Sequence, residues 1–191
     1  MTPFADDIRA GKIQEVIEAL EDIEDKLLNN VFEITVDFNT VEYISIGPTE
    51  QDSPYEIPRK QYEKVGLLLS PFHLAIISRR VEMVQLLLEK IFETKNEKPE
   101  LLLQVLECKV GINYNDHQIN MFDKDSRSLD GMNSIHLAAR FDHYSMNEIT
   151  RAMKLHMTPE TILNLIQQPT NHLLISPLHL AVQRSLTFST R

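Results

Sequence analysis

Ser70-Pro71-Phe72-His73-Leu74-Ala75 is the stretch that decides the fold, because two closely similar stretches follow it in the same chain. They are Asn133-Ser134-Ile135-His136-Leu137-Ala138 and Ser176-Pro177-Leu178-His179-Leu180-Ala181. A unit that recurs within one chain indicates a repeat architecture, in which each copy buries its apolar face against its neighbours. The three stretches therefore predict an array of similar helical units.

Each stretch begins with residues that are typical of a helix start. A Ser or Thr hydroxyl can accept a hydrogen bond from a free backbone N–H of the first turn. Proline is tolerated at the first helical position because its missing N–H would have no partner there. A second helix is predicted to begin near Val81, since the residues after it form the wide apolar stripe of a core-facing helix: Met83, Val84, Leu86, Leu87 and Leu88.

These stretches carry a resemblance to the ankyrin-repeat family, whose signature is T-P-L-H-x-A. The third copy matches it almost letter for letter, the first has Ser and Phe in place of Thr and Leu, and the second lacks the proline. The resemblance implies a mostly α fold, an ankyrin-repeat-like helical solenoid. It also implies that each motif histidine bonds backbone in a neighbouring turn.

The resemblance divides residues 1–191 into one array. A capping repeat is expected at 1–30, where Asp6 and Asp7 would face solvent, and the acidic run 21–25 is expected to continue its second helix. Repeats that each carry an extra helix are expected at 65–130 and 131–175, and an incomplete repeat at 176–191. The extra helices are predicted to open at Lys98-Pro99-Glu100 and Thr158-Pro159-Glu160. The second helix of the 131–175 repeat is expected around 145–156, and the helix of the last unit at roughly 177–184.

Residues 31–64 interrupt the helical pattern. Apolar and polar residues alternate from Phe32 to Phe38, Asn39-Thr40 breaks the run, and a second run follows from Val41 to Ile46. Alternation with a polar turn predicts a β-hairpin. The array is therefore expected to carry an inserted β-hairpin and loop near its N-terminus.

Composition limits the compartment and the partners. The chain has one cysteine, and no apolar run is long enough to span a bilayer. No basic and apolar leader precedes the first repeat, so we expect an intracellular protein of the cytoplasm or nucleus. A net charge of −9 argues against direct binding of nucleic acid or an anionic membrane. It favours another protein with a basic patch.

Catalytic and metal sites are not indicated by the sequence. His73, His136 and His179 share one motif position, so a common structural role explains all three. The other four histidines lack ligand spacing, and no phosphate loop or nucleophile motif is present. Cys108 is interpreted as a small hydrophobe on an apolar helix face. We expect no enzyme activity, no cofactor and no metal.

Candidate binding residues follow the motif, where the ankyrin family places variable positions of its concave face. Arg79-Arg80 stands where that family usually has Gly-His, and Asp142 stands where it has Gly, so both turns are expected to be reshaped. Arg and aromatic residues often anchor interfaces, and the hairpin at 31–46 is a second candidate region. The predicted protein-binding residues are Ile77, Ser78, Arg79, Arg80, Arg140, Phe141, Asp142, His143, Gln183 and Arg184.

The sequence thus predicts a non-catalytic protein–protein interaction scaffold of ankyrin type. One alternative is a regulator of a transcription factor, because the layout over 130–182 resembles part of the inhibitor-of-NF-kappaB family, although that family's D-S-G-x-x-S phosphodegron is absent. The other is the cytosolic regulatory array of a larger channel or enzyme. Self-association through the C-terminal end, with Leu186 and Phe188 as contacts, is a further possibility.

Overall fold

The computed structural model describes residues 3–20, 25–29, 32–36, 65–94, 100–113, 129–171 and 174–189. This part of the chain is mostly helical, which confirms the predicted fold class at that level. The helical segments are α1 (Pro3–Ala10), α2 (Ile13–Ala19), the π-helical turn η1 (Asp25–Asn29), α3 (Pro71–Ile77), α4 (Val81–Glu93), α5 (Leu101–Glu107), α7 (Ser134–Phe141), α8 (His143–His156), α9 (Pro159–Gln167) and α10 (Pro177–Ser189). The strands are β1 (Phe32–Val36), β2 (Val65–Leu69) and β3 (Gly111–Asn113).

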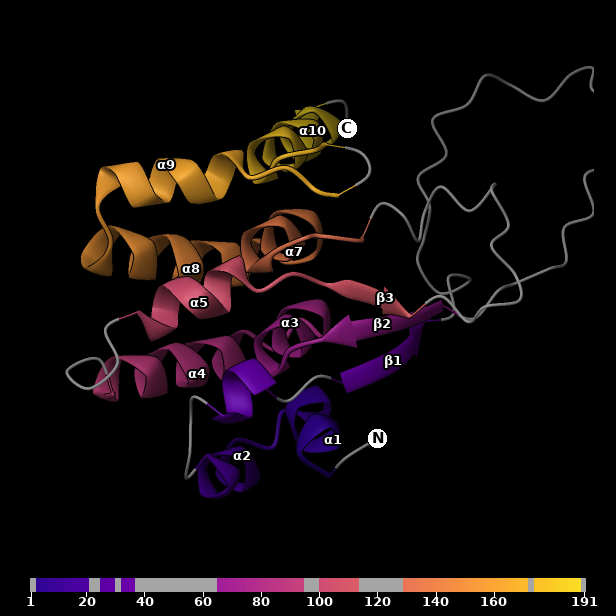
Figure 1. Ribbon diagram of the computed structural model, residues 1–191, viewed down its shortest axis with the longest axis vertical. Helices are drawn as coiled ribbons and strands as arrows, with labels where there is room; N and C mark the ends of the chain where they lie inside the picture. The colour runs from indigo at the N-terminus through magenta and orange to yellow at the C-terminus, as the bar shows by residue number, and fades with distance from the viewer. Residues whose placement is uncertain are drawn as a thin grey trace, which may run out of the picture.

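The helices stack as tiers, where a tier is one pair of consecutive antiparallel helices (Figure 1). The pairs are α1–α2, α3–α4 and α7–α8. The first helices form one row, because α1 packs on α3, α3 on α7 and α7 on α10. In a second row α4 packs on α8, and α9 contacts both α8 and α10. Helices that are far apart in sequence therefore share one continuous core.

Motif residues form the centre of that core. Phe72 and Leu74 of α3, with Ile135 and Leu137 of α7, are at most 1% exposed. The apolar stripe predicted after Val81 is confirmed, because α4 begins there and all five of its named residues are buried. Burial of a large apolar side chain contributes about 1.5–3 kcal/mol, so these positions carry much of the stability.

Helix starts follow the predicted cap chemistry. The Ser70 hydroxyl accepts a hydrogen bond from the His73 backbone N–H at 3.3 Å, and Asn133 Oδ1 accepts from the His136 N–H at 3.0 Å. Both extra helices are confirmed: α5 begins after Glu100, and Thr158 caps α9 by accepting from the Thr161 N–H.

Three boundaries differ from expectation. α2 ends at Ala19, where the N–H of Leu20 turns back to the carbonyl of Ile17, and residues 21–24 of the acidic run lie outside the described part. α8 begins at His143, two residues earlier than predicted, because Asp142 caps it. α10 reaches Ser189. In the first tier Asp6 is exposed as predicted, whereas Asp7 is partly buried beside Lys12.

The three strands form one antiparallel sheet with β2 in the middle, and Ile34 lies opposite Leu67, which lies opposite Ile112. The first predicted hairpin strand is confirmed as β1, but it pairs with residues 65–69. Residues 41–46, its predicted partner, lie outside the described part. β2 was not expected, because its apolar run Val65–Leu69 shows no polar alternation; Leu67 and Leu69 are buried.

Candidate protein-binding face

Most of the predicted binding residues lie at or beside the α3–α4 and α7–α8 turns, each of which joins the two helices of one tier. In the α1–α2 turn, Gly11 has a positive φ of 75°, and the N–H of Lys12 donates to the carbonyl of Asp7 at 2.9 Å. In the α3–α4 turn, Arg79 has a φ of 54°, and the N–H of Arg80 donates to the carbonyl of Ala75 at 3.0 Å. Both turns therefore use the same helix-ending motif with one left-handed residue.

Arg79 thus occupies a position that favours glycine, and its side chain is exposed. Arg80 is also exposed, but its Nε–H donates to the backbone carbonyl of Arg9 at 2.9 Å. This bond ties the second tier to the first, so Arg80 has a structural contact of its own. Ile77 and Ser78 are partly buried at the end of α3.

The α7–α8 turn is different, because a single residue, Asp142, joins the helices in an extended conformation with φ −147°. Its carboxylate is buried and accepts hydrogen bonds from the Tyr144 N–H at 3.1 Å and the Ser145 hydroxyl at 2.5 Å. This turn therefore has a different shape from the turns at Gly11 and Arg79. Asp142 supports the surface as a helix cap and is not itself an exposed contact.

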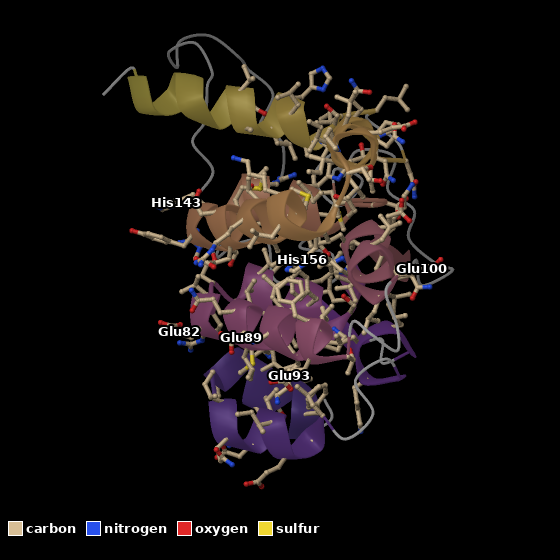
Figure 2. The ribbon with its side chains drawn as sticks, turned by 90° about the vertical axis from the view of Figure 1, so that its left-hand side faces the viewer. Glu82, Glu89, Glu93, Glu100, His143 and His156 are labelled. Carbon is tan, nitrogen blue, oxygen red and sulfur yellow. The ribbon has the colours of Figure 1, made fainter. Side chains whose placement is uncertain are left out.

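Four further residues lie around this turn, three of them predicted and one newly found. The guanidinium of Arg140 lies 5.3 Å from the ring centre of Phe141, and both side chains are partly buried. His143 is exposed and its ring contacts that of Tyr144, with ring centres 3.9 Å apart. Tyr144 is 61% exposed and was missed, although it directly follows the predicted set. Figure 2 shows His143 and Glu82, near the starts of α8 and α4, on the same side of the molecule.

The remaining predicted residues lie further along the chain. Gln183 is exposed on α10. Arg184, Leu186 and Phe188 belong to the same helix, but their side chains lie outside the described part. The described turn residues come from neighbouring tiers, and α10 contributes Gln183 from the next one.

The motif histidines join tiers. Nδ1 of His73 accepts from the Ser70 N–H at 3.4 Å, and its Nε2–H donates to the carbonyl of Cys108 at 3.0 Å. Nδ1 of His136 accepts from the Asn133 N–H at 3.2 Å, and its Nε2–H donates to the carbonyl of Ile175 at 2.9 Å. The His73 ring is therefore a neutral bridge between its own helix start and backbone that leads to the next tier. His136 bridges the equivalent groups, and its Nδ1 also lies 2.7 Å from Asn133 Oδ1.

Burial supports the neutral form, since it lowers the pKa of His73 to about 4 and also lowers the pKa of His136. The predicted structural role is thus confirmed for these two residues. His179 repeats the local half of the arrangement, accepting from the Ser176 N–H at 3.2 Å, but its side chain is exposed.

The predicted position of Cys108 on a helix face is wrong, because the residue follows α5 as its C-terminal cap. The thiol is partly buried and burial raises its pKa. Its carbonyl accepts the hydrogen bond from His73 Nε2–H, and its thiol lies against the Ser70 side chain.

A groove between α4 and α8 was not predicted. It has a volume of about 370 Å³ and lies where the second helices of two tiers meet. Figure 2 shows His156, Glu89 and Glu93 on this face, and the rings of Phe92 and His156 lie 4.1 Å apart. The groove is lined by Gln85, Leu88, Glu89, Phe92, Glu148, Arg151, Ala152, Leu155 and His156. No local sequence signal joins two helices that are about sixty residues apart.

Within the described ranges, no group of three or more His, Cys, Asp or Glu side chains is arranged to hold a metal ion. Among the helices of the same ranges, none combines the length and apolar character needed to cross a membrane. Comparison with known proteins found no matching family model, curated protein or solved structure.

Proposed function

We propose that the chain is a non-catalytic protein–protein interaction scaffold whose tiers are ankyrin-type repeats. The observation that carries the proposal is the junction that occurs twice, in which a motif histidine bonds its own helix start and a backbone carbonyl 35 or 39 residues later. Repeated residues are thus used for joining tiers. Stacked units joined in this way build extended surfaces whose exposed positions are free to vary.

The working surface of this scaffold is the turn face, defined here as Arg79, Arg140, Phe141, His143 and Tyr144. Arg79, His143 and Tyr144 are exposed, and Arg140 with Phe141 forms a cation–π pair beside them. Arg and Tyr are among the residues that contribute most to binding at interfaces. The partner is a folded protein or peptide, and the patch that docks on this face is neutral or acidic, because the turn face carries Arg79 and Arg140 although the whole chain has a net charge of −9.

Binding by this face is tested with a variant that carries Arg79→Glu, His143→Ala and Tyr144→Ala. All three side chains are exposed, so the variant should keep the fold of the parent chain. Circular dichroism of both forms checks this. Proteins captured from a cell lysate by the parent chain are identified, purified and titrated against both forms. Loss of three interface side chains should weaken binding at least about tenfold.

A matched control carries Glu160→Lys, Asn164→Ala and Gln167→Ala, which change three exposed positions of α9. The control should bind as the parent does. Equal binding by parent, variant and control would contradict the turn face as the working surface. The groove between α4 and α8 would then be tested next.

A further inference from the structure

The outer face of α10 is built like the faces that bury α3 and α7. The second motif residue after each helix cap is Phe72, Ile135 or Leu178, and the first two are 0% exposed whereas Leu178 is 54% exposed. Four residues further on, Ile76 and Ala139 are at most 4% exposed, whereas Val182 is 50% exposed. Side chains of the same kind at equivalent positions are thus covered in two tiers and uncovered in the third.

The cause is visible in the packing order. α3 lies between α1 and α7, and α7 lies between α3 and α10. α10 packs on α7 and contacts α9 (Figure 1). Leu180 is only 7% exposed, so this side of α10 faces the stack. The face with Leu178 and Val182 therefore corresponds to the faces by which α3 and α7 contact their neighbouring tiers. An apolar helical surface would fit against it.

The lack of charged residues on this face indicates which kind of surface binds it. Residues 174–183 contain no Asp, Glu, Lys or Arg, and Leu174 adds a side chain that is 70% exposed. At the other end of the stack, α1 exposes Asp6 and Arg9, so head-to-tail stacking would desolvate charges against apolar side chains. Two α10 faces bring apolar surface to apolar surface and bury no charged side chain from residues 174–183.

We propose that this face binds a second copy of the chain, with α10 of one copy against α10 of the other across a two-fold axis. Such an isologous contact uses one self-complementary patch on both copies. Leu178 and Val182 are the central contacts. This interface is separate from the turn face, so one copy can dimerise and still hold a different protein partner.

Sedimentation equilibrium of the full chain, from micromolar to hundreds of micromolar concentration, tests the proposal. The parent should approach twice the 22.1 kDa mass of one chain as the concentration rises. Leu178→Glu and Val182→Glu each place two carboxylates near the axis, so each should weaken the dimer at least about tenfold. Leu155→Glu is the control, because Leu155 is 67% exposed on α8, away from α10, and this variant should dimerise as the parent does.

Circular dichroism and thermal unfolding establish that each variant is folded, which is expected at positions this exposed. A parent that stays monomeric at every concentration would overturn the proposal and leave the face for a helix pair of another protein. A dimer that neither substitution weakens would also overturn it, because the contact would lie elsewhere. Neither result depends on the lysate partner, so failure here is distinct from failure of the proposed function.

Discussion

At the scale of single residues, His73 shows how one ring can serve two tiers. Its Nδ1 must accept a hydrogen bond from Ser70 while its Nε2–H donates to Cys108. Only the neutral tautomer with the proton on Nε2 meets both demands. Protonation would place a donor on Nδ1 against the backbone N–H and would charge a fully buried ring. The junction between tiers is therefore sensitive to acid.

The free energy of unfolding is expected to fall as the pH falls from 6.5 to about 4. His73 takes up its proton near pH 6.5 when unfolded and at about 4 when folded, so the unfolded state holds more protons between these values. At about 1.4 kcal/mol per pH unit, His73 should account for a loss of about 3 kcal/mol over this window. Above pH 6.5 its contribution should be constant. Urea unfolding at a series of pH values measures this.

The His73→Gln variant separates this effect from the protonation of carboxylates. Its pH dependence should be shallower than that of the parent, with a remainder from His136, whose pKa is also lowered by burial. Asn164→Ala, which changes an exposed side chain that does not titrate, is the control and should keep the parent's slope. Identical slopes for the parent and His73→Gln would refute the assignment.

At the scale of elements, most helices could be predicted because their signals are local. Ser70, Thr158 and the prolines after them mark helix starts within a few residues of sequence. The pairing of β1 with β2 was beyond this reasoning, since the two strands are about thirty residues apart and strand partners are selected by packing. The groove between α4 and α8 was missed for the same reason. Local pattern defines helices, whereas distant contacts define strand partners and grooves.

The α3–α4 turn is expected to become more stable on the Arg79→Gly substitution. A non-glycine residue with a φ of 54° is strained by about 1 kcal/mol, and glycine removes that strain. The gain should appear as a higher free energy of unfolding in urea, together with weaker binding at the turn face. Arg79 would then contribute to binding while lowering the free energy of unfolding.

Gly11→Ala provides the reverse change at the equivalent position of the first tier. The added Cβ would lie no closer than 3.5 Å to the Arg80 side chain, so the loss of about 1 kcal/mol should come from the φ of 75° alone. Destabilisation by Arg79→Gly, or no loss from Gly11→Ala, would contradict the shared turn geometry.

At the scale of the whole molecule, the stack depends on close contact between the loops that precede successive tiers. Gly131 leads to α7 with a φ of 75°, and its N–H donates to the carbonyl of Val110 at 3.0 Å. Asn171, in the loop before α10, donates to both the backbone and the carboxylate of Asp130 at 3.3 Å. Two consecutive loops thus lie in direct contact beside the helices.

Gly131→Ala is expected to destabilise the chain by about 2–4 kcal/mol, because an added methyl group meets both backbone strain and overpacking. Its Cβ would overlap the Asn171 side chain and lie 2.7 Å from the Asn171 backbone nitrogen. Adding Asn171→Ala should recover only part of the loss, since the backbone nitrogen remains. Full recovery in the double variant, measured by urea unfolding, would show that the side chain alone causes the clash.

The order of the tiers was largely predictable, because each motif copy announces one helix start. The loop contacts could not be predicted, since the sequence Asp130-Gly131 contains no signal that Asn171 lies beside it. Among the candidate site residues, Arg79 and His143 are exposed as the sequence suggested, whereas Asp142 is buried as a cap and Arg80 bonds the tier before it. Exposure depends on what the neighbouring tier covers, and a linear pattern does not contain that information.

The acceptors of the two histidine bridges are main-chain carbonyls, one belonging to a cysteine and the other to an isoleucine. The hydrogen bond between tiers thus requires a particular side chain, histidine, on one side. On the other side it requires only a main-chain carbonyl. The bond itself therefore places no requirement on the side chain of either acceptor residue. A protein engineer could therefore exchange the exposed residues of one unit for those of another while retaining the histidine, because the hydrogen bond between tiers does not depend on the exposed side chains.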